Sequence, residues 1–258
     1  MQKSELTFDV IEVLKEAAGK FLPALVQKVR ETLEPRDLKL FDYVFERYYL
    51  KDKIMGRWYD PYHILFSTCF ALALERTDEK ISPLIVPGII LHDIGYCALP
   101  DKTDLNNPQG RILHMQKGAA ITAKSLAEVG DFNPFEIGII VEMVATHDNW
   151  ILGIQTEDPD CLALIDTDKI FVMSFISFYK DWVGEEGKNL SIQEFFDSRR
   201  DSFHKGKHSL STKSAKEWRD KQFGARQWEI QNDILNDENS FRKYVEGHIQ
   251  SEIAAGRG

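Results

Sequence analysis

The sequence of 258 residues lacks several features that define broad protein classes. Its cysteines number only three, Cys69, Cys97 and Cys161, and this odd, widely spaced set excludes a disulfide framework and favours a reducing, cytoplasmic compartment. A basic excess is also missing, since 41 acidic residues against 32 basic ones leave a net charge of −9. This charge argues against a protein that coats nucleic acid, because neutralising phosphates requires a basic surface.

Long apolar runs are absent as well. The first residues show no basic segment followed by an apolar stretch, so we expect no signal peptide. The longest apolar run, 170–179, is far below the ~20 residues of a membrane span, and we expect it to form a helix buried on all sides. With 43% hydrophobic and 28% charged residues, the chain has the composition of an ordinary globular protein and is expected to fold as one domain over 1–258.

The prolines organise the first part of the chain. All nine precede residue 160, and five of them follow a residue that can cap a helix. The five pairs are Asp60-Pro61, Ser82-Pro83, Asn107-Pro108, Asn133-Pro134 and Asp158-Pro159. A side-chain oxygen at the N-cap accepts a free amide, and proline at the first helical position sacrifices no hydrogen bond. Each pair therefore predicts a helix start, although Asn107-Pro108 also suits a turn.

Apolar residues recur at helical spacing throughout the chain, for example at Phe66, Phe70 and Leu74. Sustained alternation of apolar and polar residues is absent, and so are the Asn-Gly and Asp-Gly turns of hairpins. The sequence therefore predicts an all-α fold with a core at about 60–180 and a helical extension at about 190–258. Candidate loops are 100–110, 152–160, 184–191 and 204–211.

Histidines and aspartates fall at the ends of the predicted helices. His92 and Asp93 directly follow the apolar run 89–91, and Asp168 lies between two further apolar segments. An unpaired carboxylate in such surroundings is costly. A metal ion removes this cost, because imidazole and carboxylate together suit zinc, iron and manganese. Taken singly, each residue is more simply explained as a packed or solvated side chain.

The ordered set His63, His92-Asp93 and Asp168 resembles the HD superfamily of metal-dependent phosphohydrolases. LHDIGY at 91–96 looks like the superfamily's central helix, and DTDKI at 166–170 is similar to its closing motif. The resemblance covers about 62–169 and implies an HD-type helical bundle in which these four residues bind metal.

Two further histidines resemble those of dinuclear members. His114 opens HMQKGAAI, and His147 stands in ATHDNW. The resemblance then implies two divalent ions, most simply iron or manganese with zinc or magnesium as alternatives, bridged by Asp93. A one-metal site with two bystander histidines is the competing interpretation. The cyclic di-GMP phosphodiesterases of the HD-GYP type are disfavoured, because NWILGI follows Asp148 where they carry Gly-Tyr-Pro.

Other side chains are weaker candidates. The resemblance suggests that Lys169 neutralises charge on a phosphate, and Asp148 is a candidate for orienting water or protonating a leaving group. The stretch 204–226 carries a net charge of +5 within an acidic chain, so Lys213, Lys216 and Arg219 are candidates for substrate binding. The competing interpretation is a solvated helix face, which is what charge runs usually form. Cys97 could be a ligand but is expected to be a small buried hydrophobe, and His248 is expected to be a packed structural residue.

The resemblance thus predicts hydrolysis of a phosphate ester or phosphoanhydride of a small metabolite, with a nucleotide as the leading substrate class. Two alternatives stay open. Mixed-valent diiron oxygenases use the same four histidines and two aspartates on the same fold. A metal-dependent binding module without turnover is the other. No feature of the sequence predicts an oligomeric state.

Overall fold

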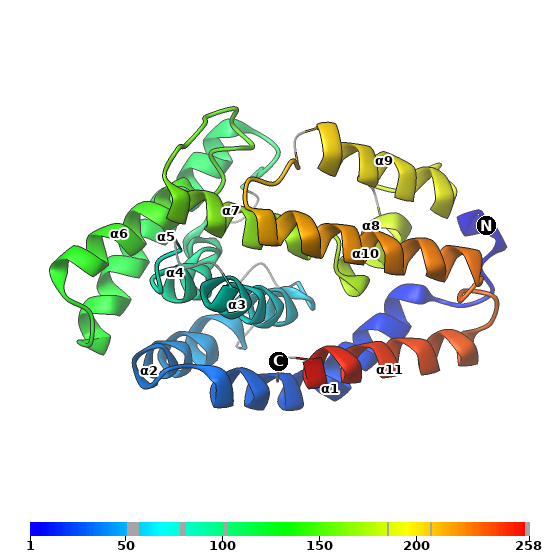
Figure 1. Ribbon diagram of the computed structural model, residues 1–258, viewed down its shortest axis with the longest axis horizontal. Helices are drawn as coiled ribbons and strands as arrows, with labels where there is room; N and C mark the ends of the chain where they lie inside the picture. The colour runs from blue at the N-terminus through cyan, green and yellow to red at the C-terminus, as the bar shows by residue number, and fades with distance from the viewer. Residues whose placement is uncertain (51–56, 78–80, 101–102, 185, 207, 256–258) are drawn as a thin grey trace. The chain divides into compact units, whose positions relative to one another are not determined.

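The computed structural model describes the chain except for residues 51–56, 78–80, 101–102, 185, 207 and 256–258. Lys207 of the basic stretch lies outside this described part. Within it, the prediction of an all-α fold is confirmed, since helices and turns are present and strands are not (Figure 1). None of the described helices is both long and apolar enough to cross a membrane.

The chain divides into two compact units. We call Val29–Asp168 the central unit, and Met1–Lys28 together with Lys169–Gly258 the terminal unit. Two helices pass the boundary, α1 (Val10–Thr32) and α7 (Pro159–Phe171). The other elements of the central unit are α2 (Pro35–Val44), the π-helical turn η2 (Phe45–Tyr49), α3 (Asp60–Thr77), α4 (Ile85–Leu91), the 3₁₀ helix η3 (Ile94–Ala98), α5 (Pro108–Val129) and α6 (Pro134–Thr146).

The short helix α4 forms the middle of the central unit. All seven of its residues are buried, which its composition IVPGIIL permits because it carries no polar side chain. Helices α2, α3 and α6 pack around it, while α5 packs along α6 and against η3 (Figure 1). The residues at the end of α4 are therefore surrounded by other helices.

Four of the five predicted helix starts are confirmed. Helix α3 begins at Asp60, and α5, α6 and α7 begin at the proline of their pair. Asn107 and Asn133 accept backbone amides of the first turns of α5 and α6. The fifth start is wrong by two residues: α4 begins at Ile85, because the Ser82 Oγ instead accepts the amide of Leu84 in a preceding turn.

The single buried helix expected over 170–179 is also wrong. Helix α7 ends at Phe171 and α8 begins at Phe175, with a turn between them. Ser174 causes the break, since its side chain accepts the amide of Ser177 and caps α8. Three loops are shorter than expected, because α5 and α7 begin at Pro108 and Pro159 and α9 continues to Lys205.

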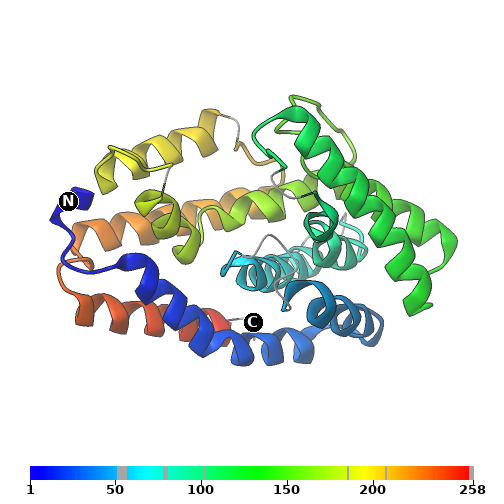
Figure 2. The same ribbon diagram turned by 180° about the vertical axis from the view of Figure 1, so that it is seen from behind.

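The terminal unit contains η1 (Lys3–Glu5), α8 (Phe175–Val183), α9 (Ile192–Lys205), α10 (Lys213–Gln231) and α11 (Glu238–Ala255). Helix α11 runs beside the first part of α1 in both views (Figures 1 and 2). The rings of Phe8 and Phe241 lie 5.5 Å apart, and Lys20 and Glu246 form an ion pair at 2.7 Å. Contacts therefore join the two ends of the sequence within this unit.

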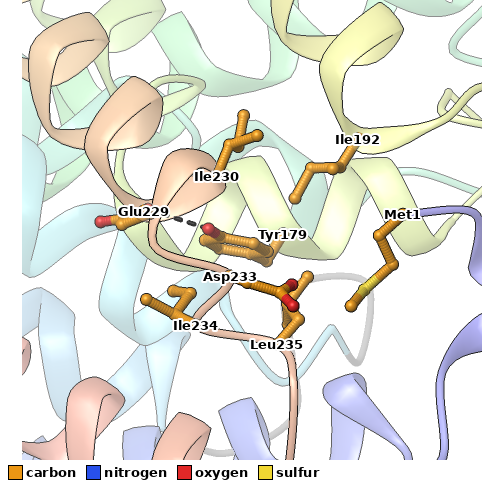
Figure 3. A pocket seen from close by; sticks show the side chains of 8 residues that line it. All are labelled: Met1, Tyr179, Ile192, Glu229, Ile230, Asp233, Ile234 and Leu235. Atoms are coloured by element: carbon orange, nitrogen blue, oxygen red, sulfur yellow. Dashed lines mark hydrogen bonds between the residues drawn. The ribbon is translucent and has the colours of Figure 1, made fainter.

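A small cavity of about 40 Å³ lies in the terminal unit, next to the Tyr179 ring (Figure 3). The buried Glu229 carboxylate accepts the hydroxyl protons of Tyr179 and Tyr244 and pairs with Arg226. The cavity has room for a few water molecules and not for a metabolite. Glu229 is fully satisfied by these partners, so the network is structural.

Candidate metal centre

Six buried or half-buried side chains of the central unit converge at the end of α4. His92 and Asp93 directly follow the last residue of α4. The other four come from separate helices: His63 from the first turn of α3, His114 from α5, His147 from the end of α6 and Asp168 from α7. All six were predicted from the sequence as metal ligands. They form two groups, and within each group the possible donor atoms all lie within 4.8 Å of one another.

The first group consists of His63, His92 and Asp168. The Oδ1 atom of Asp168 lies 3.1 Å from the Nε2 of His63 and 3.4 Å from the Nε2 of His92. His92 is fully buried, and its Nε2 makes no hydrogen bond to any described residue. A buried ring nitrogen of this kind is costly unless a ligand satisfies it.

The second group consists of Asp93, His114 and His147. The Nε2 atoms of the two histidines lie 3.2 Å apart, and they lie 3.4 Å and 3.8 Å from the Oδ1 of Asp93. Two ring nitrogens directed at one carboxylate oxygen, all buried, are arranged like the donors around a common cation.

The Asp93 carboxylate joins the two groups. Its Oδ1 faces His114 and His147, while its Oδ2 lies 3.5 Å from the Nε2 of His92 and 3.6 Å from the Nδ1 of His63. One oxygen of the same carboxylate is therefore directed at each group. Asp93 is thus shared between the two groups.

The donor separations fit a metal ion. Donors about 2.1 Å from a shared ion lie about 3.0 Å apart at a right angle and about 3.4 Å apart at the tetrahedral angle. The five separations given above within the two groups run from 3.1 Å to 3.8 Å. Imidazole and carboxylate are ligands of zinc, iron and manganese. The cluster could therefore hold a metal ion.

Backbone carbonyls orient two of the rings. The Nδ1 of His92 donates to the carbonyl of Ile89, and the Nδ1 of His147 donates to the carbonyl of Val144, each at 2.7 Å. Because a carbonyl only accepts, these bonds place the proton on Nδ1 and leave the lone pair of Nε2 directed into the cluster. Such an outer hydrogen bond is typical of histidines that bind metal.

The electrostatics of the cluster favour a cation. Burial acts to lower the pKa of His92, yet the carboxylates of Asp93 and Asp168 outweigh it and raise this pKa to about 9. Burial acts to raise the pKa of Asp168, but the imidazoles of His63 and His92 hold it below its usual range. The carboxylates thus stay ionised and require positive charge nearby, which a metal ion supplies in place of the proton.

Close backbone packing brings Asp93 and His114 together. A Cβ added to Gly95 in η3 would lie 2.2 Å from the carbonyl oxygen of His114 and 2.7 Å from the amide nitrogen of Gly118. Only glycine allows η3 to approach α5 this closely. Gly95 of the LHDIGY segment is therefore needed for the close contact between η3 and α5.

Three residues next to the cluster were not identified from the sequence. The ring of Tyr96 stacks on His114 with centroids 3.8 Å apart, and the guanidinium of Arg57 lies 5.0 Å from the Tyr96 centroid. Arg111 donates to Asp148 at 2.9 Å. Arg111 precedes His114 by three residues on α5, so helical periodicity was the signal that could have found it.

Asp148 is buried, and its Oδ2 lies 3.8 Å from the Nε2 of His147. It therefore stands at the edge of the cluster, where the sequence placed it. Its role in orienting water or in proton transfer stays a prediction.

Other candidates have contacts of their own in the terminal unit. The Lys169 ammonium donates to the carbonyl of Ser209 at 3.1 Å. On α10, Lys213 is exposed beside Glu217, Lys216 donates to the carbonyl of Ser211, and Arg219 is buried beside Asp220. Their part in substrate binding stays a prediction.

Two residues that were not expected to be ligands, Cys97 and His248, lie outside the cluster. Cys97 is half-buried, rather than buried as expected, and its thiol donates to the carbonyl of Ile94. The ring of His248 packs 4.9 Å from that of Phe175, as a structural residue does.

No family model, curated protein or solved structure matches this chain.

Proposed function

We propose that the protein is a metal-dependent phosphohydrolase that acts on a phosphate ester or phosphoanhydride of a small metabolite. The resemblance of its ligand motifs to the HD superfamily supports this proposal. The observation that carries it is the Asp93 carboxylate, whose two oxygens face two separate donor groups. A pair of ions held a short distance apart is suited to phosphoryl transfer, because both the attacking and the leaving oxygen need stabilisation.

Under this proposal His63, His92 and Asp168 would hold one divalent ion, His114 and His147 would hold the second, and Asp93 would serve both. We infer iron or manganese, with zinc or magnesium as alternatives. When bound, the ions supply an activated water and positive charge for the phosphoryl oxygens. Four neutral imidazoles and two carboxylates leave two divalent ions with a net positive charge, which favours an anionic substrate.

The protein's own residues prepare this chemistry. His92 and His147 are locked by their bonds to backbone carbonyls, so their Nε2 atoms need no reorientation on binding. Asp148, held by Arg111, is proposed to orient the attacking water or to protonate the leaving oxygen. Burial of the cluster excludes bulk water and strengthens every electrostatic contact inside it. The substrate class, a nucleotide before other phosphorylated metabolites, rests on the resemblance.

The proposal is tested by measuring phosphate release from nucleoside phosphates, sugar phosphates and an aryl phosphate. The protein should be loaded with iron or manganese and compared with protein treated with a chelator. Asp93→Asn should abolish release because it removes the bridging charge. Asp131→Asn, which changes an exposed aspartate paired with Lys39, is the matched control and should retain it. Metal-loaded protein that releases no phosphate from any of these substrates would contradict the proposal.

The same screen, run with and without oxygen, addresses the alternative of a diiron oxygenase. Hydrolysis requires no oxygen, so the rates should be equal under both conditions. Oxygen uptake coupled to substrate loss, together with no phosphate release when oxygen is absent, would instead favour the oxygenase.

A further inference from the structure

Arg57 stands beside the metal centre in a fixed orientation. Its Nε donates to Asp60 at 2.7 Å, and its guanidinium lies over the rings of Tyr59 and Tyr96, 5.1 Å and 5.0 Å from their centroids. Because the Tyr96 ring also stacks on His114, two short contacts lead from the guanidinium to a residue of the cluster. The side chain is thus held at the centre without being part of the donor set.

The terminal nitrogens of Arg57 are available. Asp60 takes only the Nε proton, and among the described residues no hydrogen bond from either terminal nitrogen is present. The side chain is 27% exposed, so a ligand can reach it. A guanidinium in this state keeps four of its five donors for an external acceptor, in the planar geometry that matches a phosphate.

Arg111, the other guanidinium near Tyr96, is not available in this way. Its Nε donates to the carbonyl of Leu105, and its Nη1 lies 2.9 Å from Asp148 and 3.3 Å from the Tyr96 hydroxyl. These three contacts account for its orientation. Arg111 therefore positions Asp148, whereas Arg57 is free to bind an anion.

The charges around Arg57 also favour it as an anion-binding residue. Burial acts to lower the pKa of Arg57, but Asp60 first, and then Tyr59 and Asp93, more than compensate and raise it. The Asp93 charge is therefore felt at the Arg57 guanidinium. An oxyanion that bridges from the metal centre to Arg57 would gain from both positive charges.

We propose that Arg57 binds the anionic group of the substrate, a phosphate or similar tetrahedral oxyanion, through its terminal nitrogens at the metal centre. Asp60 and Tyr96 are its positioning residues, the first through the hydrogen bond to Nε and the second through its ring. This inference rests on the proposed function, and it assigns the substrate anion to Arg57 rather than to the lysines of α10. The competing explanation is that Arg57 only neutralises the buried carboxylate of Asp60.

The test is the binding of inorganic phosphate to the full-length, metal-loaded protein, measured by titration calorimetry. Replacing Arg57 alone would leave Asp60, which is 3% exposed, without its partner and could unfold the protein. The double variant Arg57→Gln/Asp60→Asn removes both charges and avoids this. Asp60→Asn supplies its background, and Arg30→Gln, which alters an exposed arginine paired with Asp42, is the matched control.

Loss of a charge-assisted, two-pronged contact should raise the phosphate dissociation constant of the double variant about tenfold relative to Asp60→Asn. Metal content should stay unchanged, Arg57→Lys should be intermediate, and Arg30→Gln should behave as the wild type. Equal phosphate affinity in the double variant and in Asp60→Asn, with metal retained, would overturn the inference.

The phosphate-binding test does not depend on whether the protein hydrolyses phosphate esters. If phosphate binding depends on Arg57 but no phosphate ester is hydrolysed, the proposed function is wrong and the assignment of Arg57 stands. If esters are hydrolysed and phosphate binds without regard to Arg57, only the assignment is wrong.

Discussion

At the scale of single residues, two rings of the cluster owe their orientation to local hydrogen bonds. His92 and His147 each follow the last residue of a helix and bond through Nδ1 to a carbonyl three residues earlier. The same local pattern thus presents Nε2 from two different helices. Each of these two ring nitrogens is thus directed inward by a hydrogen bond within the last turn of its own helix.

The first prediction concerns His92. His92→Ala should lower metal content to a small fraction of the wild-type value, because His92 lies against both Asp93 and Asp168 and its loss weakens both groups. His204→Ala is the control, since His204 is exposed in the terminal unit. Elemental analysis of both purified variants provides the measurement. Full metal content in His92→Ala would show that this ring is no ligand.

His114 tests the second group separately. His114→Ala should reduce occupancy mainly at the second ion and leave His63, His92 and Asp168 able to hold the first. Metal titration of the stripped variant should then show about half of the wild-type capacity. Unchanged capacity and turnover would make His114 a bystander.

Asp37 gives a prediction that is independent of metal. It is 5% exposed, its Oδ1 has no hydrogen-bond partner among the described residues, and burial raises its pKa from 3.8 to about 6 despite the nearby Arg36. The folded state therefore favours the protonated form. Its stabilising contribution is fully present below pH 3.8 and is lost as pH rises through about 6.

Asp37→Asn removes this dependence on pH. The variant should be more stable than the wild type by about 1–3 kcal/mol at pH 8, and the difference should shrink towards zero near pH 4. Urea unfolding at the two pH values measures it. Asp42→Asn, at an exposed position, should show no comparable gain at pH 8. Equal stability of Asp37→Asn and wild type at pH 8 would refute the role of burial.

At the scale of helices, capping residues made the central unit largely predictable. Asn107 and Asn133 mark true helix starts, because their side chains cap the helix that the following proline begins. Asp60 also marks a start, although it is the first residue of α3 and its carboxylate binds Arg57. The break at Ser174 was missed because a serine inside an apolar run gives no comparable signal. Whether that serine continues a helix or caps the next depends on packing that sequence periodicity does not encode.

The six residues of the cluster were found from the sequence in two ways. Apolar neighbours indicated His92, Asp93 and Asp168, where an uncompensated polar group would be costly. His63, His114 and His147 came from the resemblance to the HD superfamily. Arg57 and Arg111 were not predicted, since arginines are common on helix surfaces and only their neighbours in space distinguish these two. The division into two units likewise depends on contacts between chain ends far apart in sequence.

The contact between η3 and α5 provides a prediction at this scale. Gly95→Ala forces a Cβ against the backbone of His114, so it should destabilise the protein by about 2–4 kcal/mol and weaken metal binding. Gly138→Ala in α6 is the control, because no atom lies within 4 Å of its added Cβ. That variant should be as stable as the wild type or gain about 0.5–1 kcal/mol. Thermal unfolding measures both. A Gly95→Ala protein of wild-type stability would contradict the close packing.

At the scale of the whole molecule, the cluster draws on five segments of the central unit. Its residues come from α3, the end of α4, α5, the end of α6 and α7, so a bound ion would join segments that are separate in sequence. Binding that occurs only in the folded state stabilises it by mass action. The electrostatic demand for a cation, seen in the raised pKa of His92, would be met at the same time.

Adding metal to stripped protein should therefore raise its free energy of unfolding, by about 2.7 kcal/mol at a free metal concentration one hundred times the dissociation constant. The Asp93→Asn variant should show a much smaller gain, and Asp131→Asn should behave as the wild type. Thermal unfolding with and without added manganese provides the comparison. No stabilisation of the wild type would mean that the cluster does not bind this ion in the folded state.

The most direct test of the account is the metal content of the purified wild-type protein, set beside that of Asp93→Asn. Elemental analysis after gentle purification, and again after reconstitution with iron or manganese, should give more than one ion per chain in the wild type. Asp93→Asn should hold fewer, because one carboxylate serves both groups. A wild-type value of one or below that reconstitution does not raise would contradict the paired centre.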